Sequence, residues 1–162
     1  MSIQTTLQMV VNTVETLTVN VPAAQNTSSI TQSGYNSNYT LPNGSVPAVE
    51  CAYFEQALSG GVASIDLRNL SGTNGRVIDL NGLKVQVVKF KAKATNANPL
   101  TVTVGASNGY LLAGAAWKVV LQPGQEVLFY GNEAAPDVGA TAKTIDLSGT
   151  GSQSVEVVII AG

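Results

Sequence analysis

The chain has 162 residues, of which eight are basic, ten are acidic and none is histidine. Charged residues make up 11% of the chain, against roughly 25% in an average soluble domain, and the net charge is −2. The missing histidine excludes catalytic pairs of serine or cysteine with histidine, and the weak negative charge predicts no general attraction to nucleic acid or to membranes. We therefore expect a protein that is not an enzyme, carries no cofactor or metal and acts through its surface.

The single cysteine, Cys51, excludes a disulfide within the chain. The first residues lack the basic start and long apolar core of a signal peptide, and no apolar run reaches the ~20 residues that span a bilayer. We therefore expect a protein made in the cytoplasm.

Apolar residues alternate with a period of two from about residue 5 to residue 21, which predicts strand rather than helix. This stretch is long for one strand, so we expect a break near residues 12–15, and Pro22 should end it. Residues 1–21 are our candidate for an N-terminal arm that pairs with the sheet edge of a neighbouring copy.

Residues 22–47 form a polar excursion rich in Ser, Asn, Thr and Tyr. It has room for a short strand or two, but its composition mainly predicts a long loop. Tyr35 and Tyr39 stand among Asn and Ser, a mixture that binding loops favour. These tyrosines are candidate partner contacts, and a loop without a binding role is the alternative.

Residues 48–162 carry the predicted sandwich core. Ala48 to Leu58 fits either a helix or a strand, and the remaining segments fit strands. The further strands are expected at 62–67, 83–94, 100–104, 110–113, 117–121, 126–130, 144–147 and 154–160. Short strands with frequent turn signals predict an all-β fold, and we expect a single-domain, antiparallel, jelly-roll-like β-sandwich.

The strand at 83–94 changes phase in its interior, because apolar residues occupy odd positions up to Val87 and even positions from Val88. A β-bulge near Val87–Val88 would keep both sets on one face. The change also aligns four lysines, which are candidate contacts to an acidic partner or, alternatively, guards on an edge strand. They are Lys84, Lys89, Lys91 and Lys93.

The carboxylates give weak indications of a site. Glu133 and Asp137 share one loop, and Asp66 and Asp146 follow isoleucine in two similar Ile-Asp-Leu segments. We nevertheless expect these carboxylates to be solvated groups on the protein surface. Trp117 and Phe129 are expected in the core, whereas Tyr110 and Tyr130 lie near strand ends, where they could be exposed.

From about Gly60 onward the chain resembles small structural proteins of tailed bacteriophages and prophages. The resemblance is carried by Gly82-Leu-Lys-Val-Gln-Val-Val-Lys-Phe-Lys, Thr95-Asn-Ala-Asn-Pro-Leu-Thr-Val, Leu121-Gln-Pro-Gly-Gln-Glu-Val-Leu-Phe-Tyr-Gly and Ile145-Asp-Leu-Ser-Gly-Thr-Gly-Ser-Gln. It implies a virion component, either a capsid decoration protein or a tail-associated module. It further implies a β-rich homo-oligomer, with a trimer favoured, that docks on the major capsid or tail protein.

An alternative function is a carbohydrate-binding or receptor-binding module of a phage tail or fibre. It would use Tyr35, Tyr39, Tyr110 or Tyr130 together with the Asn-rich loops.

Overall fold

The computed structural model describes residues 5–9, 12–21, 24–33, 37–41, 46–72 and 75–162. All regular elements among these residues are strands, apart from one 3-10 turn at Asn132–Ala134. The chain divides into two compact units: one is Gln4–Leu41, and the other, which we call the body, consists mainly of Pro42–Gly162.

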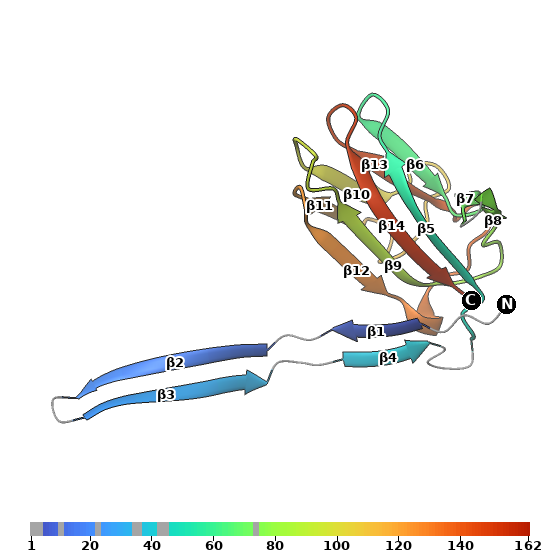
Figure 1. Ribbon diagram of the computed structural model, residues 1–162. Coiled ribbons are helices and arrows are strands. Elements are labelled where there is room, and N and C mark those ends of the chain that lie inside the picture. The colour runs from blue at the N-terminus through green and yellow to red at the C-terminus, as the bar shows by residue number, and fades with distance from the viewer. Residues whose placement is uncertain (1–4, 10–11, 22–23, 34–36, 42–45, 73–74) are drawn as a thin grey trace. The chain divides into compact units, whose positions relative to one another are not determined.

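Eight strands of the body form two antiparallel four-stranded sheets (Figure 1). Sheet I has the order β12-β9-β14-β5 and contains β12 (Glu126–Tyr130), β9 (Val85–Ala92), β14 (Ser154–Ala161) and β5 (Glu50–Ala57). Sheet II has the order β11-β10-β13-β6 and contains β11 (Lys118–Leu121), β10 (Leu100–Val104), β13 (Thr144–Ser148) and β6 (Val62–Asp66). A separate short pair joins β7 (Leu70–Ser71) to β8 (Val77–Ile78).

Successive strands of these two sheets alternate between sheet I and sheet II, except for the hairpin that joins β10 to β11. Eight antiparallel strands with this order make a jelly roll. The all-β, antiparallel, sandwich-type fold predicted from the sequence is therefore confirmed. The turn Gln122–Gln125 leads from sheet II to sheet I, with Gly124 at a φ of 83°, the conformation that a type II turn requires of its third residue.

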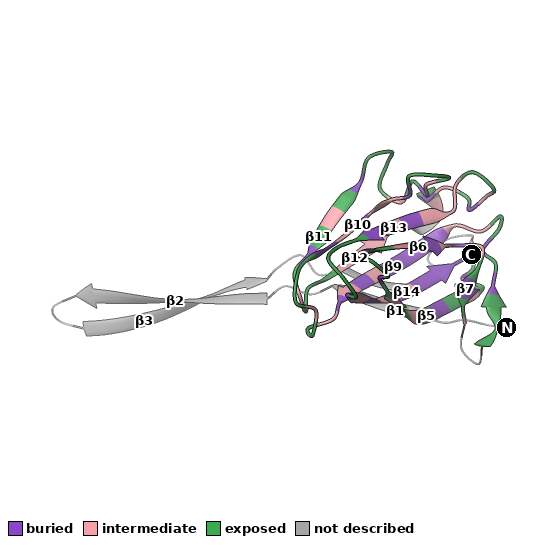
Figure 2. Ribbon diagram, turned by 90° about the horizontal axis from the view of Figure 1, so that it is seen from above, coloured by how far each residue is buried: buried purple, intermediate pink, exposed green. Residues whose placement is uncertain are grey.

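The core lies between the two sheets, where buried residues follow the facing sides of the strands (Figure 2). Its apolar residues come from both sheets and from the segments that join them, between Ala52 and Ala161. Trp117 and Phe129 lie next to each other, with ring centroids 5.9 Å apart and ring planes tilted by 59°. The predicted placement in the core is confirmed for Trp117, whereas Phe129 is partly buried and packs against the core.

The predicted phase change in β9 is present as a bulge. Val87 pairs with Ile160 and Val85 pairs with Ala161, so Gln86 is the extra residue. The bulge lies just before the predicted position, and its effect is the expected one. Val85 and Val88 both belong to the core, although an uninterrupted strand would place them on opposite faces.

Tyr110 connects the two sheets from a fully buried position. Its backbone N–H donates to Thr144 O of sheet II at 2.8 Å. Its hydroxyl accepts from the Val85 N–H of sheet I at 3.2 Å and donates to Pro136 O at 2.7 Å. Burial raises the pKa of Tyr110 to about 12, so the hydroxyl keeps the proton that it donates.

Several expectations about individual segments are corrected. The ambiguous segment at 48–58 contains strand β5, and its residues alternate between the core and solvent. The strand expected at 110–113 does not form, because Tyr110 packs inward and only isolated bridges at Gly109 and Leu112 flank it. The 22–47 stretch is not mainly loop, since two of the strands described next lie within it.

The Gln4–Leu41 unit consists of two antiparallel ribbons of two strands each (Figure 1). β1 (Thr5–Met9) pairs with β4 (Ser37–Leu41), and β2 (Asn12–Val21) pairs with β3 (Ala24–Ser33). β2 ends at Val21, directly before Pro22, as expected. The segments predicted as an arm and as a polar excursion therefore pair with each other.

Replacement of Tyr110 by Phe should lower the free energy of unfolding by about 1–3 kcal/mol, because it leaves the buried Val85 N–H and Pro136 C=O without their partner. Denaturant titration measures this value. Tyr53→Phe is the control, because Tyr53 is 62% exposed and the change should stay within about 0.5 kcal/mol. Equal effects of the two substitutions would show that the Tyr110 hydroxyl does not hold the sheets together.

Candidate functional site

All four lysines predicted as partner contacts form ion pairs with carboxylates of their own chain. Lys89 contacts Glu126 at 2.8 Å, Lys91 contacts Glu156 at 3.6 Å, Lys93 contacts Glu55 at 2.8 Å, and Lys84 contacts Asp137 at 2.7 Å. β9 lies between β12 and β14, so the alternative role as guards of an edge strand is wrong. The lysines contribute to a balanced charge pattern, and they do not leave four free positive charges.

The same pairing extends over the rest of the body. Three further ion pairs join Arg68 to Asp79, Arg76 to Glu50 and Lys143 to Asp66. Among the described residues, Lys118 is the one basic residue with no carboxylate within 4.0 Å. Exposed pairs of this kind contribute little to stability, because water and salt screen them. Their larger effect is to leave few uncompensated charges on the body.

These pairs shift the carboxylates toward their ionised form. The hydrogen bond from Lys93 lowers the pKa of Glu55, that from Arg68 lowers the pKa of Asp79, and that from Lys89 lowers the pKa of Glu126. Desolvation by itself would raise the pKa of Asp66, but hydrogen bonds from Lys143 and the Arg68 N–H outweigh it and lower that pKa. The carboxylates are therefore held as charged surface groups, which is the opposite of a general acid.

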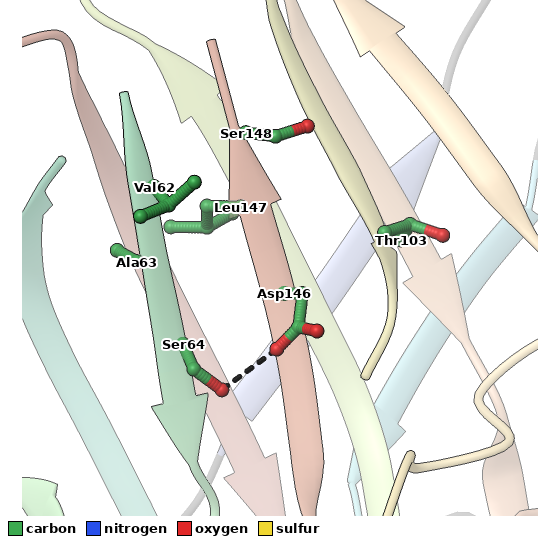
Figure 3. A pocket seen from close by; sticks show the side chains of 7 residues that line it. All are labelled: Val62, Ala63, Ser64, Thr103, Asp146, Leu147 and Ser148. Atoms are coloured by element: carbon green, nitrogen blue, oxygen red, sulfur yellow. Dashed lines mark hydrogen bonds between the residues drawn. The ribbon is translucent and has the colours of Figure 1, made fainter. Parts of the chain in front are cut away.

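The outer face of sheet II carries a shallow groove of about 470 Å³ (Figure 3). It runs over β6, β13 and β10 and is lined by Val62, Ala63, Ser64, Thr103, Asp146, Leu147 and Ser148. The groove is shallow and is lined partly by short hydroxyl side chains. An exposed valine lies on each of the two edge strands of the sheet. Val62 on β6 is 62% exposed and Val120 on β11 is 51% exposed.

Asp146 is the charged residue of the groove, and both of its carboxylate oxygens accept hydrogen bonds. Ser64 Oγ donates to Asp146 Oδ1 at 2.7 Å, as Figure 3 shows, and the Ala106 N–H donates to Oδ2 at 2.8 Å. The two similar Ile-Asp-Leu segments are neighbouring antiparallel strands, so Asp146 lies opposite Ser64 and Asp66 lies opposite Thr144. Each aspartate has its own partners, and neither is arranged as part of a catalytic pair.

The described residues contain no cluster of three or more metal-ligating side chains. In the loop that contains both Glu133 and Asp137, Asp137 pairs with Lys84 and Glu133 accepts a backbone hydrogen bond from Val46. The groove and this loop can therefore offer hydrogen bonds and flat contact area, and their described groups form no constellation for acid–base or metal chemistry.

The tyrosines proposed for glycan binding differ in their surroundings. Tyr110 is fully buried and Tyr130 is partly buried. Tyr39 lies in β4 opposite Leu7, and Tyr35 is outside the described residues. The most exposed tyrosine of the body is Tyr53 on edge strand β5, which could not be selected from the sequence because its segment fits either a helix or a strand.

Cys51 lies two residues before Tyr53 on the same strand and is exposed. Partial burial of its thiol raises its pKa, which disfavours the reactive thiolate.

Two side chains hold the backbone of Val46: Glu133, which was considered above as a candidate site residue, and Gln86, which was not selected from the sequence. Glu133 Oε1 accepts from the Val46 N–H at 3.0 Å, and Gln86 Nε2 donates to Val46 O at 2.9 Å. Gln86 is the bulge residue of β9 and is only 2% exposed. The sequence feature that could have identified Gln86 is its position inside an apolar strand, because a buried amide needs hydrogen-bond partners.

Comparison with known proteins gives structural likeness without a family. No family model and no curated protein matches the chain. A solved structure described as "Bacillus endospore appendages form a novel family of disulfide-linked pili" is similar over 74% of this chain and 90% of that chain, with 17% identity and a TM-score of 0.42. Among the described residues, no helix has the length and apolar character needed to cross a membrane.

The ion-paired carboxylates predict loss of stability in acid. Their pKa values are lowered in the folded state below ordinary values of 4.5 for Glu and 3.8 for Asp, so the stabilisation is complete above about pH 4.5. It should disappear as the pH falls through the lowered values. Between pH 5.5 and 7 the free energy of unfolding should stay flat, because the chain has no histidine to titrate.

Urea titrations from pH 7 to pH 2.5 measure this profile. The variant Glu55→Gln/Asp79→Asn should show a shallower decline below pH 4.5 than the wild type, because two of the shifted groups are gone. If the free energy of unfolding of the variant falls as steeply with pH as that of the wild type, the ion-paired carboxylates are not the cause of the acid instability.

Proposed function

We propose that this protein is a non-enzymatic structural component of a virion, in which copies associate with one another. The observation that carries the proposal is the division of the chain into a complete jelly-roll body and a separate unit of β-ribbons. The described residues of the body form a hydrophobic core that draws on both of its sheets. A ribbon unit with a single charged residue, Glu15, supports a role as a contact element between copies.

The body surface fits the same role. Its described basic side chains are largely compensated by carboxylates, and the groove on sheet II offers short hydroxyl groups between two exposed valines. Such a surface can pack on a repeating neighbour without bringing like charges together. Little in it would hold and activate a small substrate.

The position of the protein on the virus particle is a more specific proposal. It rests on the resemblance from Gly60 onward to phage and prophage structural proteins. On that basis we place the protein on the capsid as a decoration protein that is made in the host cytoplasm and docks on the major capsid protein. A trimer is the favoured homo-oligomer, again from the resemblance alone.

Purified protein should form species larger than one chain in sedimentation velocity, and their proportion should rise with concentration. Because the body's charges are mostly paired within the chain, raising the salt from 50 to 500 mM should change the association constant by less than about threefold. A chain that stays monomeric at every concentration would remove the proposal. Strong weakening by salt would instead indicate contacts between opposite charges.

The location has its own test. Immunogold labelling of particles from producing cells should decorate capsids at regular positions. Labelling confined to tails, or absent from particles, would contradict the capsid assignment and leave the association result unaffected.

A further inference from the structure

The outer face of sheet II carries two rows of side chains, each with one residue from every strand. Residues directly opposite each other on neighbouring strands share a face of the sheet. The first row consists of Val62, Ser148, Thr101 and Val120. The second row consists of Ser64, Asp146, Thr103 and Lys118. The residues between the two rows, such as Val102 and Leu147, belong to the core, so both rows lie on the outer face (Figure 3).

The second row holds two opposite charges that the described part of the body does not neutralise. Lys118 has no carboxylate within 4.0 Å, and Asp146 forms no ion pair with a described residue. Thr103 lies between them in the row and keeps them two strands apart. Each oxygen of Asp146 accepts one hydrogen bond, so each has a second lone pair for a cation.

The first row has the same pattern when it is read from either end. An exposed valine stands at each end, with Val62 at 62% and Val120 at 51% exposure, and two short hydroxyl side chains lie between them. The groove of about 470 Å³ runs beside this row over β6, β13 and β10. A face with two raised edges and a low centre fits a copy of itself that is turned by 180° about an axis parallel to the strands.

We propose that the outer face of sheet II binds the same face of a second copy, with the two-fold axis between β13 and β10. The inference rests on the proposed function, since it names a surface through which copies associate. This axis places β6 over β11 of the second copy and β13 over β10 of the second copy. Val62 then meets Val120 of the second copy. Lys118 lies over Ser64 of the second copy and one strand, ~5 Å, from its Asp146, which the flexible lysine stem can span.

The charges select this axis over an axis that crosses the strands. An axis across the strands places every strand over the same strand of the second copy. Lys118 would then face Lys118 or Val120, and Asp146 would face Asp146 or Ser148, so neither charge would meet its opposite. Like charges brought together oppose association. Exposed ion pairs contribute little in water, so the Lys118–Asp146 pairs fix the orientation and add little to the strength.

The area of the face makes this contact a weak one. Four strands ~4.8 Å apart and about five residues long cover ~19 Å by ~17 Å, so two copies would bury ~650 Å² in total. That area belongs to weak and transient contacts, below the ~1,600 Å² of a standard interface. We therefore expect a reversible dimer that is populated at high protein concentration. On a particle, further contacts of each copy would strengthen it through multivalency.

Crosslinking of single cysteines tests which positions face each other. Val62→Cys and Val120→Cys are made in separate chains, each with Cys51→Ser to remove the exposed native thiol. Packed sheets are ~10 Å apart, so a short bismaleimide is used because a direct disulfide cannot span that gap. The mixture of the two variants should crosslink at least tenfold more than either variant alone. In the proposed dimer the two copies of Val62 are three strands, ~14 Å, apart along the sheet in addition to the gap.

A charge placed on the face gives a second readout. Val120→Lys puts an ammonium group where Val62 of the second copy should lie. Val77→Lys is the matched control, because Val77 is 64% exposed and belongs to β8, outside sheet II. Sedimentation velocity of the full chain should show the dissociation constant raised at least tenfold by Val120→Lys and changed less than threefold by Val77→Lys. An unchanged unfolding midpoint shows that both variants fold.

The remaining outcomes separate the two proposals. If the wild type associates, but Val120→Lys associates equally well or the three crosslinking samples give equal yields, the face contact is wrong and the structural role stands. If the wild type never associates, both proposals fail. Labelling with a monofunctional maleimide identifies another occupant: a Val120→Cys thiol already protected in dilute monomer would show that the same chain covers this face, which also overturns the inference.

Discussion

The bulge at Gln86 is the constraint on which much of the body depends. One extra residue in β9 returns Val88 to the core side after Val85 and leaves Lys89 and Lys91 on the outer face, where their carboxylate partners lie. Without it, every later residue of the strand would change sides.

The same residue connects the core to the segment that enters the body. The backbone O of Gln86 accepts from the Gly131 N–H, and its side-chain amide donates to Val46 O. Gln86 Oε1 has no partner among the described residues, although the atom is buried. A buried amide left half satisfied carries a cost, and fixing Val46 is the identifiable gain.

The charge pattern and the fold together narrow the class of function. Seven ion pairs on exposed or half-buried positions add little stability, yet they compensate most of the charge that the body carries. Catalytic sites use burial and unbalanced neighbours to move pKa values toward neutrality. Here the pKa values of the shifted carboxylates move away from neutrality, so these groups stay ionised at neutral pH.

The sequence was sufficient for the parts of the fold that depend on local periodicity. Alternation located most strands, and the switch from odd to even apolar positions revealed the bulge within one or two residues of its place. Tyr110 was missed because the fate of a tyrosine depends on whether its hydroxyl finds partners, and Val85 and Pro136 are distant in the chain.

The lysine row shows the same limit. The spacing of Lys89 and Lys91 predicts that they share one face of β9, but β12 and β14, which supply their carboxylate partners, flank that strand only through long-range pairing. The ribbon partner of β2 was also hidden, because β3 consists mainly of Ser, Thr, Asn and Gln and resembles loop composition.

A closed sandwich and an incomplete ribbon in one chain serve different needs. The described residues of the jelly roll form a core of their own. Each ribbon consists of two strands that pair with each other, and a two-stranded ribbon by itself is only marginally stable in water. The ribbons therefore depend more than the body on contacts beyond their own strands. If those contacts come from neighbouring copies, as the proposed structural role requires, order in the ribbons rises with protein concentration.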